Sequence, residues 1–246
     1  MKKTISALLA CALLCSGPAF AEAPGTSAHS AILMHADTGE VLYEQNADDR
    51  MLIASTTKIM TALVVLENCA LDETVKIDSR SAGTEGSSMY LRDGDEYTVE
   101  ELLYGLMLVS GNDAAMALAL HTAGSVEDFA ELMNGLAAGI GMTGSHFANP
   151  HGLDAEDHYS TARDMALLAA YAMDNDDFAR IVSSRSAVVQ GQALYNHNKL
   201  LSLYEGCIGV KTGYTMAAGR TLVSCAERGD TRFICVTLCD SDDWDD

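Results

Sequence analysis

Positive charge is scarce in this chain of 246 residues. Lysine and arginine together number 15 against 35 aspartates and glutamates, which gives a formal charge of −20 at neutral pH. Such a surface repels a polyanion, so the sequence predicts no nucleic-acid partner. The acidic residues are spread over predicted loops, which is typical of a solvated surface that keeps a protein soluble.

Proline is rare as well, with only 3 residues, and the sequence contains no proline-rich linker, internal repeat or low-complexity segment. A chain of this length can bury one substantial core, or form one domain with a smaller lobe, but it is too short for two full domains. We therefore expect a single folded domain over residues 22–246.

No membrane anchor is visible in the sequence. The apolar run at residues 5–15 is shorter than the roughly 20 residues that span a bilayer. It follows Lys2 and Lys3 and precedes the small-residue motif Ala19-Phe20-Ala21, an order typical of a secretory signal peptide over residues 1–21. We expect cleavage before Glu22 and export to an extracytoplasmic location, whether the cell wall, the periplasm or the face of an outer membrane.

Two alternatives to a cleaved signal stay open. The apolar run could be retained as an anchor, or Leu8-Leu9-Ala10 before Cys11 could mark a lipoprotein, although that would leave residues 19–21 unexplained. Cleavage removes two lysines, so 13 basic and 35 acidic side chains remain and the formal charge becomes −22.

Cysteine forms no metal-binding pattern in this sequence. Cys11 and Cys15 lie in the predicted signal, and the mature chain keeps Cys69, Cys207, Cys225, Cys235 and Cys239. Five thiols cannot all pair with one another, and none stands in a CxxC spacing. Several lie in apolar runs and are expected to be buried small hydrophobic residues. A disulfide between neighbouring strands, for example Cys225 with Cys235, stays open.

Two familiar hydrolase motifs are also absent. The sequence has no GxSxG, the turn that carries the serine of many Ser-His-Asp enzymes, and no HExxH zinc motif. His146, His151 and His158 lie in a loop-rich region, where we expect them to be structural hydrogen-bonding groups. The sequence therefore predicts no metal and no cofactor.

Strand patterns lie at both ends of the chain. Residues 31–34 and 41–43 are β-prone runs around Asp37-Thr38-Gly39, which predicts a hairpin. Three further runs, at residues 207–211, 221–226 and 232–238, predict an antiparallel meander.

Helical patterns fill the middle. Residues 55–66 are apolar nearly all round, which predicts a buried helix. Thr98 and Glu101 have the spacing of a capping box for a helix through Leu108. Other helical patterns cover residues 112–122, 125–140 and 161–173. We predict an α+β fold in which N- and C-terminal strands form one antiparallel sheet, backed by helices, with an all-helical lobe inserted at about 95–175.

The first chemical motif is Ser55-Thr56-Thr57-Lys58. A spacing of three on a helix puts the hydroxyl and the amine on one face, one turn apart. A lysine accepts a serine proton only if its ammonium form is disfavoured by burial or by another positive charge. The helix N-terminus favours the negative charge that develops at Ser55. Taken alone, the motif also fits an ordinary helix start with a surface lysine.

A second motif, Ser110-Gly111-Asn112, stands at a break between two helical patterns. Its hydroxyl can relay a proton, and its amide can hold Lys58 and a substrate carbonyl. Taken alone, it also fits a helix cap.

The third motif, Lys211-Thr212-Gly213, lies in a predicted strand before Tyr214. Such a strand can pair with an extended peptide while Lys211 and Thr212 bind its carboxylate, and Gly213 leaves room for that approach. Taken alone, the lysine also fits an edge strand protected against aggregation.

The joint occurrence of SxxK, SxN and KTG, in this order and on suitable elements, is the pattern of penicillin-binding proteins and class A β-lactamases. After the predicted signal the chain has only four lysines, at positions 58, 76, 199 and 211, and two of them complete motifs. Residues 29–238 resemble the D-alanyl-D-alanine carboxypeptidases of the low-molecular-mass penicillin-binding protein type, the S11 peptidase family. The segments at residues 149–154, 160–162 and 164–165 resemble these carboxypeptidases rather than the class A β-lactamases.

The resemblance implies a β-lactamase/DD-peptidase-like fold and a DD-peptidase catalytic domain over residues 22–246. It implies that the enzyme removes the terminal D-alanine from peptidoglycan stem peptides and that β-lactams inhibit it covalently. The roles that it implies are Ser55 as nucleophile, Lys58 as general base, Ser110 and Asn112 as the second catalytic element, Lys211 with Thr212 and Gly213 as the carboxylate-binding strand, and the backbone N–H groups of Ser55 and Tyr214 as the oxyanion hole.

Two rival functions stay open beside this interpretation. A β-lactamase needs a second base to activate water, and we find none at a convincing position. A non-catalytic peptidoglycan-binding protein would not need all three motifs intact. Family members usually continue into a further helix, often with a second β-rich domain and an amphipathic anchor, so we expect a chain truncated at its C-terminus.

Overall fold

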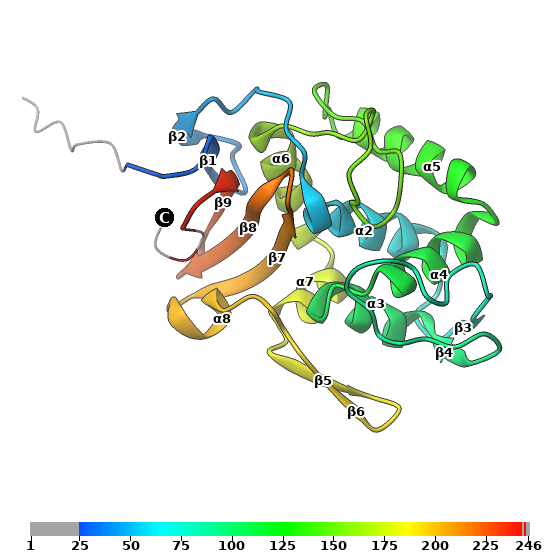
Figure 1. Ribbon diagram of the computed structural model, residues 1–246. Helices are drawn as coiled ribbons and strands as arrows, with labels where there is room; N and C mark the ends of the chain where they lie inside the picture. The colour runs from blue at the N-terminus through cyan, green and yellow to red at the C-terminus, as the bar shows by residue number, and fades with distance from the viewer. Residues whose placement is uncertain (1–24, 243, 245–246) are drawn as a thin grey trace, which may run out of the picture.

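The computed structural model describes residues 25–242 and residue 244, so the predicted signal peptide lies outside it. A five-stranded antiparallel sheet lies beside a group of helices (Figure 1). Its strands, in spatial order, are β2 (Val41–Gln45), β1 (Ser30–His35), β9 (Thr231–Asp240), β8 (Gly219–Arg228) and β7 (Cys207–Thr215). The N- and C-terminal parts of the chain thus form one sheet, which confirms the predicted α+β fold.

The strand register explains which residues enter the core. β1 pairs with β9 from Ser30 opposite Leu238 to His35 opposite Phe233. Between β8 and β9, Cys225 stands opposite Ile234 and faces the core, whereas the adjacent position pairs Ser224 with Cys235. Neighbouring residues of a strand point to opposite faces. This register excludes a disulfide between Cys225 and Cys235.

Most helices lie on one side of the sheet, and the short α8 (Leu200–Leu203) lies at its β7 edge (Figure 1). The helices are η1 (Ala54–Thr57), α2 (Lys58–Asn68), α3 (Val99–Leu108), α4 (Asn112–Ala123), α5 (Val126–Gly139), α6 (Ala162–Met173), α7 (Asp176–Ser183) and α8. Helix α2 is buried at every residue from 58 to 65 and contacts α3, α4, α5 and α6. Its all-round apolar sequence therefore reflects a central position among the helices.

Helix α3 has the predicted start, and helix α6 packs against the sheet. Thr98 Oγ1 accepts a hydrogen bond from Glu101 N at 3.1 Å, and Glu101 Oε2 accepts one from Thr98 N at 2.9 Å, so the predicted capping box of α3 is confirmed. Helix α6 is the last helix in the range predicted for the inserted lobe, and it packs against β1, β8 and β9 of the sheet.

Several short elements were not predicted. Helix α7, the hairpin β5 (Ser186–Val189) with β6 (Gln192–Tyr195), and α8 all lie between α6 and β7. A further two-stranded sheet joins β3 (Thr74–Lys76) to β4 (Glu96–Thr98).

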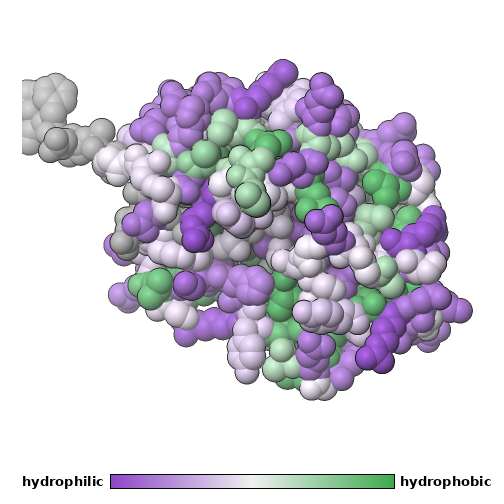
Figure 2. Space-filling view, in the orientation of Figure 1, coloured by the Kyte–Doolittle hydropathy of each residue, from purple (hydrophilic) through white to green (hydrophobic). Residues whose placement is uncertain are grey.

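Hydrophilic side chains dominate the face shown in Figure 2, with smaller hydrophobic groups between them. Among the described residues, no helix combines the length and the apolar character that a bilayer crossing requires.

Candidate active site

Ser55 lies on a tight turn rather than on the regular α-helix that its sequence predicts. The turn η1 is a 3-10 helix, and α2 begins only at Lys58. Thr56 Oγ1 donates to the carbonyl of Ile53 at 2.6 Å, and Thr57 Oγ1 donates to the carbonyl of Ala54 at 2.8 Å. Ala54 has a positive φ of 45°, an unusual conformation for a residue with a side chain. These bonds hold the turn that presents Ser55.

Gly152 packs directly against this turn. A Cβ atom at Gly152 would overlap the carbonyl of Ala54 and stand 2.8 Å from Thr57 Oγ1, and the φ of Gly152 is +87°. Only glycine meets both conditions without strain. The loop that contains His151 can therefore approach Ser55 and Lys58 closely.

Lys58 is the centre of the hydrogen-bonding network. Its Nζ lies 2.9 Å from Ser55 Oγ, 2.7 Å from Asn112 Oδ1 and 2.7 Å from the carbonyl oxygen of His151. The amide and carbonyl oxygens only accept hydrogen bonds, so they take two N–H groups of the amine. When Lys58 is neutral, its lone pair is the group left to face the hydroxyl of Ser55.

The orientation of Asn112 is fixed by the loop opposite it. Asn112 Nδ2 donates to the carbonyl of Glu85 at 2.6 Å, and its backbone N–H donates to the carbonyl of Ser87 at 2.7 Å. The amide nitrogen therefore faces the loop, and Oδ1 faces Lys58. A Cβ at Gly86 would stand 2.6 Å from Asn112 Nδ2, so this close approach also depends on a glycine.

The carboxylate of Asp113 holds the same loop. It accepts hydrogen bonds from Ser88 Oγ at 2.6 Å, Met89 N at 2.9 Å and Leu91 N at 3.1 Å. Asp113 is fully buried, and these donors compensate for the loss of water around it. No sequence motif indicated a role for Asp113.

Burial controls the charge of both motif lysines. The side chain of Lys58 is fully buried, which lowers its pKa well below the usual value, and the positive charge of Lys211 lowers it further, while Asp113 acts in the opposite direction. Burial also lowers the pKa of Lys211 to about 7. The neutral form of Lys58 is thereby favoured, as proton acceptance from Ser55 requires.

Strand β7 passes beside the turn that carries Ser55. A Cβ at Gly213 would stand 2.8 Å from the backbone nitrogen of Ser55 and would overlap Thr221 Oγ1. Thr221 Oγ1 in turn donates to the carbonyl of Ile53 at 3.2 Å. Lys211 is buried, and its Nζ donates to the carbonyl of Thr212 at 2.8 Å. The KTG strand thus lies at the edge of the sheet, against the nucleophile turn.

The remaining motif residues lie on the same elements. Ser110 is buried between α3 and α4, two residues before Asn112, and has a positive φ of 61°. Thr212 is partly exposed on β7, and Tyr214 next to Gly213 is exposed. Direct hydrogen bonds join Ser55, Lys58 and Asn112, whereas the KTG strand meets them through packing and charge.

Two of the three histidines singled out in the sequence, His151 and His158, contact the residues of the site. His158 Nδ1 accepts a hydrogen bond from Ala148 N at 3.1 Å, so the neutral ring carries its proton on Nε2 and donates it to Thr57 Oγ1, 2.7 Å away. Burial lowers the pKa of His158 to about 4, and burial with the charge of Lys58 lowers that of His151 to about 4. Both rings are therefore neutral at pH 7.

This fold is that of the DD-peptidase-like penicillin-binding proteins, and the three motifs occur together in penicillin-binding proteins and class A β-lactamases. The sequence model of the D-alanyl-D-alanine carboxypeptidases matches residues 18–242. The chain belongs to this family, the S11 peptidases.

Individual relatives agree with the family match. The D-alanyl-D-alanine carboxypeptidase DacF of Bacillus subtilis is 37% identical over 97% of this chain and 66% of its own length. DacC of Escherichia coli is 41% identical over 88% of this chain and 58% of its own length. The chain therefore spans less than two thirds of these two relatives.

Solved structures of similar proteins have the same fold. A D-alanyl-D-alanine carboxypeptidase from Mycobacterium tuberculosis superposes with a TM-score of 0.86 at 36% identity, over 90% of this chain and 86% of that chain. The carboxypeptidase DacD from Francisella tularensis superposes with a TM-score of 0.84 at 31% identity, over 92% of this chain and 70% of that chain.

Proposed function

We propose that this protein is a serine-type D-Ala-D-Ala carboxypeptidase that removes the terminal D-alanine from peptidoglycan pentapeptides through an acyl-enzyme on Ser55. The position of Lys58 gives this proposal its main support. The buried amine of Lys58 lies 2.9 Å from Ser55 Oγ while two acceptors, on Asn112 and His151, take its other hydrogen bonds. Such an amine is placed to accept the serine proton.

In the acylation step, Ser55 Oγ attacks the carbonyl carbon of the penultimate D-Ala, and its proton passes to Lys58 Nζ. The backbone N–H groups of Ser55 and Tyr214 stabilise the oxyanion of the tetrahedral intermediate. The C–N bond to the terminal D-Ala then breaks. The leaving amine receives the proton from Lys58 through Ser110.

In the deacylation step, a water molecule attacks the ester carbonyl. Lys58 accepts a proton from this water and returns one to Ser55 Oγ as the stem peptide leaves. The relatives DacF and DacC are D-alanyl-D-alanine carboxypeptidases, which supports hydrolysis as the outcome.

Strand β7 supplies the substrate-binding edge. β7 is an edge strand of the sheet, so an extended peptide can pair with its exposed edge. The terminal carboxylate of the peptide would then lie near Lys211 and Thr212. Gly213 leaves the space that this approach needs. Asn112 holds Lys58 through Oδ1 and the loop at Glu85 through one N–H, so only the second N–H of its amide is left to donate to a substrate carbonyl.

The cellular setting follows from the substrate. Peptidoglycan lies outside the cytoplasmic membrane, and the secretory signal predicted at residues 1–21 would deliver the chain there. β-Lactams resemble the acyl-D-Ala-D-Ala terminus and carry a strained amide, so they should acylate Ser55 as well.

Covalent trapping tests the proposal. Incubation with benzylpenicillin should add the mass of one antibiotic to the peptide that contains Ser55, and Ser55→Ala should lose this addition. Ser202→Ala, an exposed serine on α8, is the matched control and should still be labelled. Release of free D-Ala from a pentapeptide by the parent chain, and not by Ser55→Ala, completes the test. Labelling of another residue, or no release of D-Ala, would exclude the proposed function, and rapid penicillin turnover would favour a β-lactamase.

A further inference from the structure

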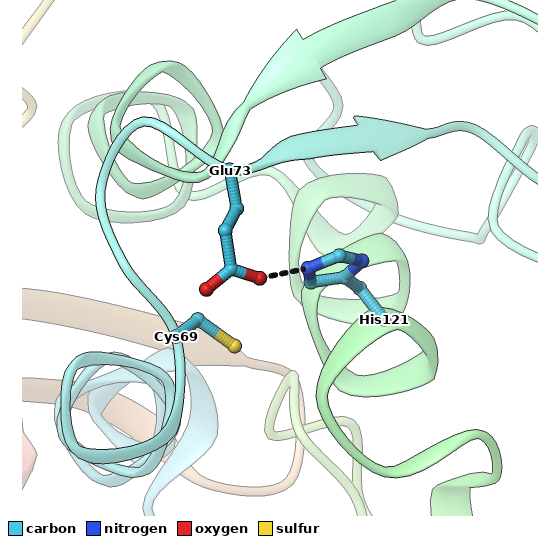
Figure 3. A group of neighbouring side chains, drawn as sticks. All are labelled: Cys69, Glu73 and His121. Carbon is cyan, nitrogen blue, oxygen red and sulfur yellow. Dashed lines mark hydrogen bonds and ion pairs between the residues drawn. The ribbon is translucent and has the colours of Figure 1, made fainter.

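Three side chains with metal-binding atoms meet at a place that the proposed catalysis does not use. The Sγ of Cys69, a carboxylate oxygen of Glu73 and a ring nitrogen of His121 all lie within 4.8 Å of one another, and the three side chains point into one common space (Figure 3). Cys69 caps the C-terminal end of α2, and His121 lies in the last turn of α4. These are the opposite ends of the two helices that begin with Lys58 and Asn112.

Existing contacts hold the three groups in position. Ala70 N donates to Glu73 Oε1 at 2.6 Å, and the other oxygen, Oε2, lies 3.1 Å from His121 Nε2. The backbone N–H of Cys69 donates to the carbonyl of Val65 at 2.8 Å. Each side chain therefore starts from an ordered backbone, and the carboxylate already faces the imidazole.

The cysteine has an alternative partner in this arrangement. Cys69 Sγ lies 3.4 Å from Thr122 Oγ1, whose own hydroxyl donates to the carbonyl of Leu118 at 2.8 Å. The thiol can donate to the threonine oxygen in the absence of a metal. Once the thiol leaves the threonine, its sulfur is available to His121 and Glu73, whose ligand atoms lie within 4.8 Å.

We propose that Cys69, Glu73 and His121 bind a zinc ion. Thiolate, imidazole and carboxylate are the ligands that Zn²⁺ takes in proteins, whereas Mg²⁺ and Ca²⁺ select oxygen atoms alone. With Zn–ligand distances of about 2.0–2.3 Å, tetrahedral donors stand roughly 3.3–3.7 Å apart. His121 Nε2 and Glu73 Oε2, 3.1 Å apart, already stand near that spacing. The ligand atoms all lie within 4.8 Å of one another, so the sulfur needs to move closer by about 1.5 Å at most. Glu73 and His121 are exposed, so water can occupy the fourth position.

The zinc ion would link the C-terminal ends of α2 and α4. On binding, the thiol of Cys69 loses its proton to solvent as the Zn–S bond forms, and His121 binds as the neutral imidazole. A ligand that binds only the folded state stabilises it by an amount that grows with the logarithm of its concentration relative to its Kd. This inference does not rest on the proposed peptidase activity, because the cluster shares no residue with that site.

Cobalt substitution gives a direct test. Addition of Co²⁺ to the reduced full-length protein should produce a thiolate-to-cobalt charge-transfer band and the strong visible bands of tetrahedral Co²⁺, saturating at one equivalent and disappearing on addition of Zn²⁺. Cys69→Ser and His121→Ala should lose the charge-transfer band. Cys239→Ser, which removes an exposed thiol on β9, is the matched control and should keep it.

Thermal unfolding gives a second readout that does not depend on colour. Zn²⁺ should raise the Tm of the parent chain and of Cys239→Ser, and the exposed, isosteric variant Glu73→Gln should lose most of that rise while its metal-free Tm stays unchanged. Absence of a one-equivalent band, or a band that survives Cys69→Ser, would overturn the site. Penicillin labelling of the same samples reports on Ser55 alone, so failure of either proposal is seen separately.

Discussion

Gly213 lies against Ser55 so closely that a methyl group on the glycine would stand 2.8 Å from the backbone nitrogen of the serine. This contact joins the edge strand β7 to the turn η1, two segments that are far apart in the sequence. The absence of a side chain at position 213 sets the space between strand and nucleophile. We expect that space to decide where an acyl group can lie.

Substitution of Gly213 tests whether the contact between β7 and the turn η1 controls the site. In Gly213→Ala, the added methyl pushes β7 away from the turn, and a displacement of about 1 Å costs on the order of 100-fold in rate. Overpacking should also lower the free energy of unfolding by about 1–3 kcal/mol. The measurements are the second-order rate constant of acylation by a fluorescent penicillin and unfolding in urea.

Gly135→Ala is the matched control, because nothing lies within 4 Å of a Cβ at this position on α5. It should gain about 0.5–1 kcal/mol of stability through helix propensity and acylate like the parent chain. Parent-like acylation by Gly213→Ala would show that the strand does not control the site.

The amide of Asn112 is expected to set the pH range of acylation. In Asn112→Asp, a carboxylate replaces the neutral oxygen that lies 2.7 Å from Lys58 Nζ, so the ammonium form is favoured and the pKa of Lys58 rises. The acid limb of the acylation rate against pH should move to higher pH by about 1–3 units. Asn68→Asp adds the same charge at the far end of α2 and should leave the limb in place.

The buried Lys211 predicts a rise in stability above neutral pH. Its pKa is about 7 in the folded chain against a usual 10.5, so between these values the unfolded chain holds a proton that the folded chain lacks. The free energy of unfolding therefore increases with pH from about 7, by up to about 1.4 kcal/mol per unit. Urea unfolding at pH 7.0–8.5 should show this slope in the parent chain and a smaller one in Lys211→Met. The exposed Lys76→Met should retain it.

His158 predicts a pH dependence of the same sign on the acid side, since its folded-state pKa is lowered as well. Its pKa falls from 6.5 to about 4 on folding, so only the unfolded chain gains the proton as the pH drops through that window. The stability is fully present above pH 6.5 and declines by up to about 3 kcal/mol as the pH approaches 4. His158→Gln should unfold in urea with a weaker dependence on pH from 6.5 to 4.5. If His158→Gln and the exposed-residue control His29→Gln had the same pH dependence as the parent chain, a protonated ring would be tolerated.

Local spacing predicts only part of the candidate site. The approach of Ser55 to Lys58 follows from their separation by three residues, because one helical turn brings such positions together. The contact between Lys58 and Asn112 depends on how α2 packs against α4, and at the sequence level only the joint motif pattern indicated it. The carbonyl of His151 gives no signal at all, because a backbone oxygen is common to every residue type.

The fold, like the site, was predictable from the sequence only in part. Long patterns such as α2 and the C-terminal meander were predictable from their periodicity, and the capping box fixed the start of α3. The hairpin of β5 and β6 has strands of four residues each, too short for an alternation to be recognised. The cluster of Cys69, Glu73 and His121 escaped detection because His121 lies on α4, and only the packing brings α4 to the connection between α2 and β3 that carries Cys69 and Glu73.

The order β2-β1-β9-β8-β7 has a consequence for biosynthesis. β1 and β2 leave the ribosome well before β7, β8 and β9, the other strands of this sheet. A nascent chain that ends before β7 holds the SxxK turn without the strand that lies beside it, so Ser55 acquires its surroundings only after residue 215 has been made. Nascent chains should consequently be inert toward peptides and antibiotics alike.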